Sequence, residues 1–216
     1  MKKLFHGSEK IIKKPVYGQG RIDNDYGQGF YCTEDIELAR EWAALDERGG
    51  FVNSYSFNER GMRIMDLTMP EYSVLSWMAL LLKNRNVRLS SPLEKRAREF
   101  LIRQYLPDTK KADVIVGYRA DDSYFSFARA FLSNTITIDQ LSTALSLGDL
   151  GLQYMIKNER AFQALHYDGV EPADGMTYYP RRIARDRSAR DRYMQLLEDA
   201  DKHGRYINDI MKGEGR

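Results

Sequence analysis

The sequence has few cysteines, little excess charge and no long apolar run, and each shortage excludes a class of protein. The single cysteine, Cys32, excludes an internal disulfide framework and a multi-cysteine metal site, and it is typical of a reducing compartment. A net charge of +2 does not by itself indicate nucleic acid or a membrane as a partner. The longest apolar stretch, residues 74–82, is too short to span a bilayer, and the N-terminus lacks the apolar run of a signal peptide. We therefore expect a soluble cytoplasmic protein without a membrane partner.

What the sequence does contain is the composition of a folded domain. Its 216 residues are 43% hydrophobic and 12% aromatic, which is enough to bury one compact core. Strands are expected at residues 2–6, 29–33, 49–58, 62–68, 112–118, 152–157 and 162–167, and helices after Thr33, at 70–85, 91–106, 123–133 and 137–146, and from 181 onward. This order predicts a mixed α+β fold with a split β-sheet, inserted helices and a C-terminal helix.

The domain boundaries follow from the same pattern. Residues 1–180 are expected to form the main domain, with a helical insert at about 70–106, and residues 181–216 a basic C-terminal helix and tail. The first helix has a marked start, because Thr33 can cap it and two acidic residues follow in the first turn. Leu38, Trp42 and Leu45 are spaced to face the sheet.

The tetrapeptide YGQG occurs at residues 17–20 and again at 26–29. No Gly-Lys-Ser/Thr follows either copy, so a Walker-type phosphate loop is excluded, and neither extends to the G-x-G-x-x-G of a dinucleotide-binding helix start. The two copies are too close together to be structural repeat units. Each YGQG tetrapeptide therefore predicts a turn. The second is followed immediately by a predicted strand rich in aromatic residues.

The remaining single-residue candidates are few. The three histidines, His6, His166 and His203, are too scattered for a helical metal pair, so no metal site is predicted. A thiol–imidazole pair of Cys32 with His6 is one hypothesis, although plain strand packing of the cysteine is the commoner outcome.

Three segments together resemble the ADP-ribosyltransferase superfamily, in its His-Tyr-Glu-like branch. They are LFHGS at residues 4–8, YGQGFYCTEDIELAREWA at 26–43 and LQYMI at 152–156. The wording is most similar to a group of uncharacterised bacterial domains that share the HGS, GxGFYxT and AxxWA motifs and a strand followed by Ala-Asp-Asp, here residues 120–122. The resemblance covers roughly residues 1–170. It implies two small sheets with a cleft for NAD between them.

The resemblance also implies roles for individual residues. Tyr31 and Trp42 would hold the nicotinamide ring, and the backbone of Gly7 would meet its carboxamide, for which the small Ala39 leaves space. The expected catalytic residues are His6, Tyr31 and Gln153. The expected NAD-binding residues are Gly7, Ser8, Arg21, Gly29, Ala39 and Trp42.

These roles suit the chemistry of NAD cleavage. Breaking the nicotinamide–ribose bond passes through an oxocarbenium-like state, so a site must hold the pyridinium ring flat and fix the ribose hydroxyls. Two aromatic faces attract a cationic ring by about 0.5–2 kcal/mol each. His6 would bond hydroxyls of the adenosine ribose, and Arg21 could reach the pyrophosphate as a donor fork.

The third motif departs from the family pattern. The branch has a glutamate on the late strand, where this sequence has Gln153, and an amide cannot supply negative charge to a cationic transition state. Glu159 is the alternative if the alignment is shifted. Each candidate also has a structural interpretation: His6 bonded to backbone, Tyr31 packed in a sheet, or Trp42 packed in a helix face.

Two charged segments each have both a functional and a structural interpretation. The run 119–122 is either a ligand rim or a charged turn in which Asp122 caps a helix. RRIARDRSARDR, residues 181–192, holds six arginines and two aspartates, which suits nucleic acid or an acidic partner, or else a solvated helix with internal Arg–Asp pairs.

We expect an NAD-dependent ADP-ribosyltransferase or NAD glycohydrolase that uses NAD as substrate and transfers ADP-ribose to a macromolecule, protein or nucleic acid. The resemblance further implies a bacterial toxin-like role with an antitoxin-like partner. One alternative is a catalytically silent module that binds NAD, ADP-ribose or a protein. Another is a protein that binds nucleic acid through the arginine-rich helix.

Overall fold

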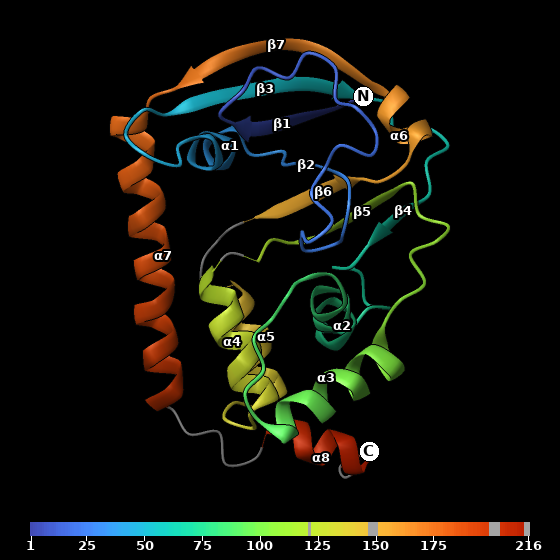
Figure 1. Ribbon diagram of the computed structural model, residues 1–216, viewed down its shortest axis with the longest axis vertical. Coiled ribbons are helices and arrows are strands. Elements are labelled where there is room, and N and C mark those ends of the chain that lie inside the picture. The colour runs from blue at the N-terminus through green and yellow to red at the C-terminus, as the bar shows by residue number, and fades with distance from the viewer. Residues whose placement is uncertain (121, 147–150, 199–203, 214–216) are drawn as a thin grey trace.

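The computed structural model describes residues 1–120, 122–146, 151–198 and 204–213 of the chain. They form a mixed α+β fold in which two β-sheets lie above a group of helices (Figure 1). The expected α+β class with a split sheet and inserted helices is therefore confirmed at this level.

The seven described strands divide into a three-stranded and a four-stranded sheet. The three-stranded sheet has the order β1 (Lys2–Ser8), β3 (Gly50–Phe57), β7 (Leu165–Ala173), and the four-stranded sheet β2 (Phe30–Cys32), β6 (Leu152–Ile156), β5 (Val114–Tyr118), β4 (Ile64–Asp66). All neighbours are antiparallel except β4 and β5. A backbone bridge also joins the two sheets, in which Phe5 and Thr33 exchange hydrogen bonds of 2.8 and 2.9 Å. This bridge holds the end of β1 beside β2, which is where the candidate site forms.

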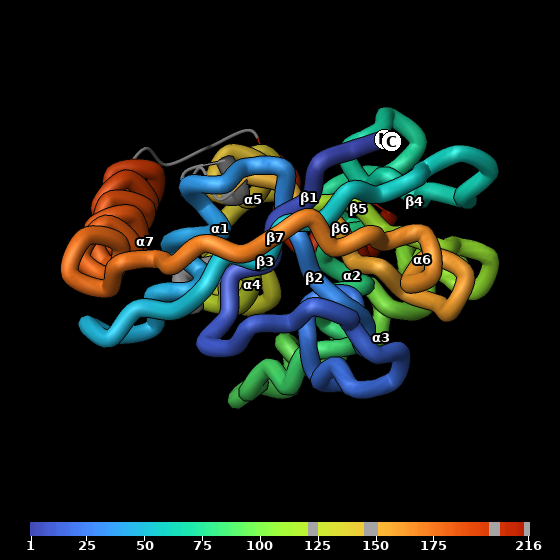
Figure 2. The backbone as a smooth tube through the Cα atoms, turned by 90° about the horizontal axis from the view of Figure 1, so that it is seen from above, coloured from blue at the N-terminus to red at the C-terminus, as the bar shows by residue number. Residues whose placement is uncertain are grey.

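Eight helices are described. They are α1 (Ile36–Ala43), α2 (Val74–Asn84), α3 (Pro92–Tyr105), α4 (Asp122–Leu132), α5 (Ile138–Ser146), α6 (Glu159–Gln163), α7 (Gly175–Glu198) and α8 (Ile207–Lys212). Seen from above, α7 lies at one side of the molecule and β4 at the other (Figure 2). Within the described residues, none of the helices combines the length and the apolar character needed to cross a bilayer.

The four-stranded sheet is buried on both faces, because β5 alternates between two cores. Val114 and Val116 pack toward the three-stranded sheet with Tyr55 and Phe57. Ile115 faces the opposite way, into the larger core built with α2, α3, α4 and α5. The period of two along a strand explains this division, and a strand buried on both faces reads as the continuous apolar run VIVGY.

The start and the end of α1 differ from the sequence expectation. The N-cap is Asp35, whose carboxylate accepts from the backbone N–H groups of Glu37 and Leu38, whereas the Thr33 hydroxyl accepts from the N–H of Asp35 itself. The expected Thr33 cap was therefore wrong by two residues. Leu45 does not face the sheet and is 48% exposed, because the helix ends at Ala43 and its periodicity ends with it.

The strand expected at residues 162–167 was only partly correct. Asn158 caps a short helix, α6, by accepting from the N–H of Ala161, so Phe162 and Gln163 are helical. Strand β7 begins at Leu165 and continues to Ala173 through a glycine and a proline. Both residues weaken a strand pattern, and β7 tolerates them because it is an edge strand.

The C-terminal region is also different from the single polar helix expected from residue 181. Helix α7 already begins at Gly175, where the Asp174 carboxylate accepts from the N–H of Thr177. It is held against α1 by Arg185, which makes two 2.8 Å hydrogen bonds to the buried carboxylate of Glu41. A second helix, α8, follows and buries Ile207 and Ile210. An ion pair therefore holds α7 against α1, whereas apolar burial holds α8.

Candidate functional site

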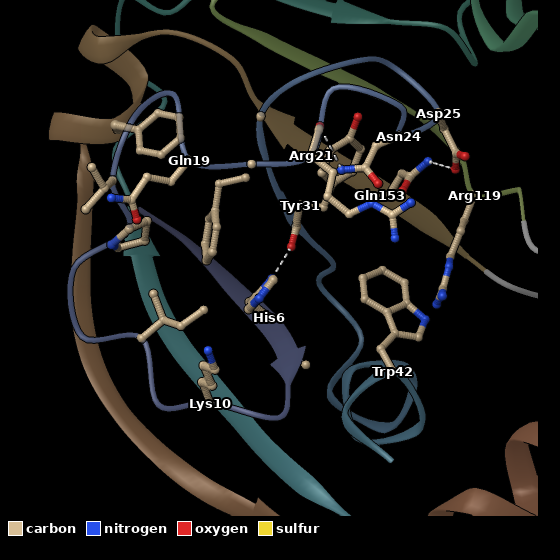
Figure 3. Close-up of a pocket in the computed structure, with 18 of the residues that line it drawn as sticks. His6, Lys10, Gln19, Arg21, Asn24, Asp25, Tyr31, Trp42, Arg119 and Gln153 are labelled. Atoms are coloured by element: carbon tan, nitrogen blue, oxygen red, sulfur yellow. Dashed lines mark hydrogen bonds between the residues drawn. The ribbon is translucent and has the colours of Figure 1, made fainter. Parts of the chain in front are cut away.

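A cavity of about 720 Å³ opens between the end of β1, the loop before β2, the start of α1 and the ends of β5 and β6 (Figure 3). It brings together residues that are far apart in sequence. Seven of the nine predicted site residues line it: His6, Gly7, Arg21, Gly29, Tyr31, Trp42 and Gln153.

The cavity wall is strongly cationic. Six basic side chains line it, Lys10, Lys14, Arg21, Arg85, Arg119 and Arg182. Among the described residues of the wall, Asp25 is the sole carboxylate. Within the described part of the chain, Lys10, Lys14 and Arg182 make no side-chain ion pair, so their charges are available to a ligand. Such a wall attracts an anion with more than one negative group.

His6 lies at the junction of the two sheets. Its Nδ1 is 2.6 Å from the carbonyl oxygen of Tyr31, and its ring stacks on Phe30 with centroids 4.3 Å apart. Burial lowers the pKa of His6, which favours the neutral ring. A carbonyl can only accept, so Nδ1 carries the proton and Nε2 is left as the acceptor.

Tyr31 is held by the second YGQG turn. Its hydroxyl donates to the carbonyl of Gly27 at 2.7 Å and accepts from the N–H of Tyr26 at 3.1 Å. The ring of Tyr26 stacks along it at 6.5 Å. Burial raises the pKa of the Tyr31 hydroxyl, so it stays protonated and acts through its ring and its hydrogen bonds.

The two YGQG copies pack against each other. The side-chain amide of Gln28 donates to the carbonyls of Gly18 and Gly20 at 2.7 and 2.9 Å. A Cβ at Gly20 would lie 2.4 Å from the carbonyl oxygen of Gly29, and one at Gly29 would lie 2.7 Å from that of Ile156. The glycines therefore allow a close-packed double turn over the end of β6, which forms one wall of the cavity.

Trp42 projects from α1 into the cavity from the side opposite the turn (Figure 3). The guanidinium of Arg119 lies over its ring, 4.3 Å from the centroid. Its indole N–H is buried and has no hydrogen-bond partner among the described residues. A buried donor without a partner is costly, so this N–H marks a place where a ligand or water would be stabilised.

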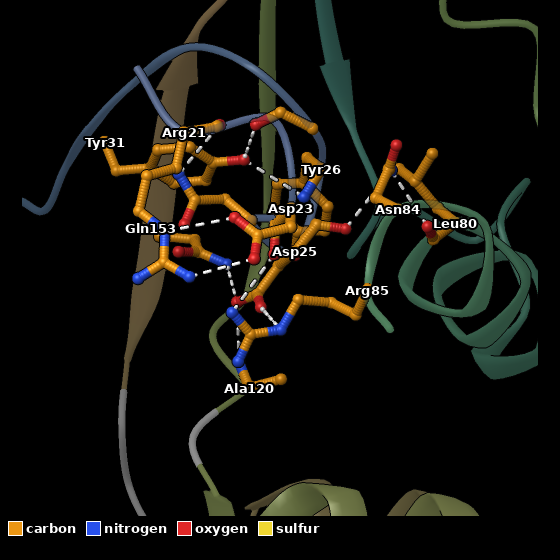
Figure 4. Close-up of polar contacts among 12 residues, drawn as sticks. Arg21, Asp23, Asp25, Tyr26, Tyr31, Leu80, Asn84, Arg85, Ala120 and Gln153 are labelled. Carbon is orange, nitrogen blue, oxygen red and sulfur yellow. Dashed lines mark hydrogen bonds and ion pairs between the residues drawn. The ribbon is translucent and has the colours of Figure 1, made fainter. Parts of the chain in front are cut away.

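Gln153 and Asp25 form the polar floor of the cavity (Figure 4). The Gln153 amide nitrogen donates to Asp25 Oδ2 at 2.8 Å and to the carbonyl of Tyr118 at 3.2 Å. Asp25 Oδ2 also accepts from the N–H of Ala120 at 3.0 Å, while Oδ1 lies 3.5 Å from Arg85 Nε. Burial raises the pKa of Asp25 despite these contacts.

The other predicted residues do not line the cavity. Ser8 hydrogen-bonds the backbone of Lys10 and the amide of Asn53. Ala39 is fully buried behind Gly7, where a Cβ on the glycine would lie 2.0 Å from the Ala39 carbonyl oxygen. Gly7 thus has a packing role, because only a glycine lets α1 approach β1 this closely.

The alternatives to these residues also have definite places. Glu159, the alternative to Gln153, is exposed at the start of α6. Cys32 is fully buried, and burial raises the pKa of its thiol, so it packs in the core and is no nucleophile. Of the run 119–122, Arg119 and Ala120 line the cavity, whereas Asp121 and the side chain of Asp122 lie outside the described residues.

Sequence reasoning missed Asp25 and Arg85. Asp25 lies in the stretch RIDND between the two glycine turns, where an acidic residue is ordinarily solvated. Arg85 follows α2 and was assigned to a helix end. The available signal was an acidic residue placed directly before the second YGQG tetrapeptide.

A second hollow of about 280 Å³ adjoins the first, between α1 and α7. Trp42, Arg119 and Arg182 line both cavities. Its other basic residues are already paired, Arg185 with Glu41 and Arg190 with Asp186. A ligand in the first cavity could therefore extend toward α7 past Trp42. No group of three His, Cys, Asp or Glu side chains gathers as metal ligands in the described residues.

The fold and the site define a mixed α+β protein with a cationic cavity between two sheets. Residues 2–167 match the family model described as a protein of unknown function, DUF3990, and the chain belongs to that family. The match covers both sheets, apart from the part of β7 beyond Tyr167, and the walls of the cavity except Arg182 on α7. Neither the curated proteins nor the solved structures contain a significant match to the chain.

Proposed function

We propose that this protein binds NAD in the cavity between the two sheets and cleaves its nicotinamide–ribose bond, with transfer of ADP-ribose to a macromolecule or to water. The observation that carries the proposal is the meeting of His6, Tyr31 and Trp42 around one cavity with a strongly cationic wall. The fold proposed with it is the ADP-ribosyltransferase-like split sheet, with a toxin-like role in bacteria.

The nicotinamide ring is assigned to the space between Tyr31 and Trp42. Tyr26 covers one side of the tyrosine ring and Arg119 covers one side of the tryptophan ring. Both residues line the cavity, and we assign the other face of each ring to a flat cationic ligand, which would gain about 0.5–2 kcal/mol from each face. The unpartnered indole N–H of Trp42 can donate to an oxygen of the ligand.

The pyrophosphate is assigned to the basic side chains of the wall. Lys10 and Lys14 line the cavity from the loop after β1, and Arg21 lines it from the double turn. Arg21 is bound to Asp23 by hydrogen bonds of 3.0 and 2.9 Å, so it would have to exchange this partner for phosphate. The neutral His6 offers Nε2 as an acceptor for a ribose hydroxyl.

The first experiment is a titration with NAD followed by tryptophan fluorescence and calorimetry. Trp77 is buried, with its indole N–H bonded to Tyr26 and Tyr118, so Trp42 is the reporter in the cavity. We expect saturable quenching that persists in Trp77→Phe and is lost in Trp42→Phe. Tyr31→Ala should weaken binding about 2- to 30-fold, the equivalent of one aromatic face. Absence of both quenching and heat at millimolar NAD would remove the proposed site.

Release of nicotinamide decides between an enzyme and a module. We expect the protein to release nicotinamide from NAD, alone or with a cell lysate as the source of acceptor, and Tyr31→Ala to stop the release. Tyr31→Phe is the matched control, because it keeps the ring and removes only the bonds to Tyr26 and Gly27. NAD that binds and stays intact after long incubation would leave the second candidate, a silent NAD-binding module, which the amide at Gln153 favours.

A further inference from the structure

The proposed reaction needs a negative charge that Gln153 cannot provide. When the C1′–N bond of NAD breaks, its electron pair goes to nicotinamide, which leaves neutral, and positive charge develops on the ribosyl ring. A hydroxyl or water then bonds to C1′ and releases its proton. Stabilisation of the ribosyl cation by a fixed anion is the main electrostatic contribution that a site can make to such a step.

The described wall of the cavity holds one carboxylate, and it lies against Gln153. We propose that Asp25 is the catalytic anion of this site, which stabilises the ribosyl cation, and that Gln153 is a positioning residue for it. This inference rests on the proposed function, because it assigns the charge for that same reaction. It adds a residue from the loop before β2, outside the three segments that carry the resemblance.

The geometry explains why an amide occupies position 153. The amide nitrogen of Gln153 faces two acceptors, Asp25 Oδ2 and the carbonyl of Tyr118, so the opposite amide orientation would place oxygen against oxygen. A glutamate at 153 would place a second carboxylate against the first and force one of them to take up a proton. Gln153 is therefore the residue that suits an ionised Asp25.

Asp25 is not explained by phosphate binding or by a saturating ion pair. A carboxylate in a cationic wall opposes the binding of an anionic ligand. The guanidinium of Arg85 lies 3.5 Å from Asp25 Oδ1 and also donates to the carbonyl of Asp23, and Arg119 is a second cation that acts on the carboxylate. Its two shorter contacts, from Ala120 and Gln153, are hydrogen bonds that a neutral amide could equally accept. The negative charge is the one property at this position that only a carboxylate provides.

The test compares Asp25→Asn with the wild type in NAD binding and in nicotinamide release. Asparagine keeps an oxygen for Ala120 and Gln153, removes the charge, and places an amide nitrogen where Oδ1 faces Arg85. We expect kcat to fall at least about 100-fold, as for loss of one strong transition-state contact, while the Kd for NAD changes less than about threefold. Asp46→Asn, which removes an exposed carboxylate outside the cavity, is the control and should leave kcat unchanged.

A charge exchange sharpens the test. The double variant Asp25→Asn with Gln153→Glu moves the carboxylate to the neighbouring position and keeps one negative charge in the floor. We expect the kcat of the double variant to be at least tenfold higher than that of Asp25→Asn. A double variant no more active than Asp25→Asn, both folded by melting temperature, would overturn a role for the charge.

The remaining outcomes separate this inference from the proposed function. If the wild type binds no NAD, both fail. If it binds NAD and releases no nicotinamide, or if Asp25→Asn releases it at the wild-type rate, the catalytic role of Asp25 is wrong while NAD binding stands. If Asp25→Asn loses NAD affinity in proportion to kcat, Asp25 is a binding residue, and this inference is again overturned.

Discussion

The two ends of strand β5 carry buried aspartates in opposite electrostatic states. Asp113 immediately precedes the strand, and Asp25 accepts a hydrogen bond from Ala120 just beyond its other end. Both side chains lie outside the strands, in the segments before β2 and before β5, and are almost fully excluded from solvent. The pKa of Asp113 is lowered, whereas that of Asp25 is raised.

The difference lies in the balance between burial, which dominates at Asp25, and hydrogen bonding, which dominates at Asp113. Asp113 accepts from the backbone N–H and the guanidinium of Arg63 and from the amide of Asn158, all with contacts between 2.7 and 3.2 Å. Asp25 has two hydrogen bonds on one oxygen and a 3.5 Å contact on the other. Asp113 therefore gains from ionisation in the fold, while for Asp25 the cost of burial exceeds what its partners return.

This contrast separates a carboxylate that stabilises the fold from one that the fold tolerates. A carboxyl whose ionisation is disfavoured by burial, in the wall of a cavity, is what is expected where function rather than stability has fixed the residue. The same sheet thus has one end built for folding and the other built for a ligand.

The largest expected effect on stability is that of Asp113→Asn. A carboxyl whose pKa is lowered by folding adds stability above its unfolded pKa and loses it as the pH falls. At neutral pH the variant should lose about 2 kcal/mol, the contribution of charged hydrogen bonds. Thermal unfolding should show a fall in Tm of about 4–8 °C for a chain of this size.

The pH dependence provides the control for Asp113. Below about pH 4, where an unfolded aspartate is already protonating, the wild type loses the same contribution and the two melting temperatures should converge. A difference that stays constant down to pH 3 would show that lost packing, not charge, causes the effect.

Asp25→Asn should have the opposite sign and a smaller size. Because folding raises the pKa of Asp25, its stabilising contribution is present at low pH and is lost as the pH rises through the folded value. Asparagine mimics the protonated carboxyl, so at neutral pH the variant should melt at or above the wild-type temperature, by less than the fall expected for Asp113→Asn.

Several groups surround Asp25 and set the conditions of this measurement. Arg85 and Arg119 lower its pKa, while the neighbouring hydroxyls of Tyr26 and Tyr31 have raised pKa values and stay neutral. The gain in Tm should therefore disappear in acid, where Asp25 is protonated in the wild type. A clear loss of stability in Asp25→Asn at neutral pH would make Asp25 a structural residue like Asp113.

The sequence predicted the parts of the fold that local patterns determine. The strands near residues 2–6, 29–33 and 112–118 and the tandem helices in 70–106 are present because their apolar periodicity and bounding turns agree. It failed where tertiary contacts decide. Strand β7 forms through a glycine and a proline because β3 pairs with it, and Leu45 is exposed because α1 ends two residues earlier.

The site, like the fold, was predicted only in part. His6, Tyr31 and Trp42 could be named from motif wording, and they do line one cavity. Asp25 could not be named, because its burial depends on contacts with residues 95 and 128 positions away in sequence, at Ala120 and Gln153. Pairing across such distances leaves no local pattern, so a buried carboxylate and a solvated one look alike in sequence.

The smallest effect is expected from the exposed arginines of α7. Arg190 pairs with Asp186 at 2.9 Å one helical turn away, and its side chain is 56% exposed. Exposed pairs of this kind contribute about 0.3–0.5 kcal/mol, so Arg187→Ala with Arg190→Ala should shift Tm by about 2 °C or less. The larger stability effect at Asp113 would then come from the burial of its carboxylate, since an exposed Arg–Asp pair contributes little.

The same double variant tests nucleic-acid binding through this helix. It is a better probe than truncation near residue 180, since truncation would remove Tyr193, which packs on Phe127 in the core. If the helix grips phosphates, the double variant should bind nucleic acid more weakly and with a log–log salt slope reduced by up to about two. Three of the six arginines in residues 181–192, Arg181, Arg185 and Arg190, are already paired with carboxylates, so we expect weak binding and no such change. A steep salt dependence that the double variant abolishes would instead make α7 a nucleic-acid contact beside the cavity.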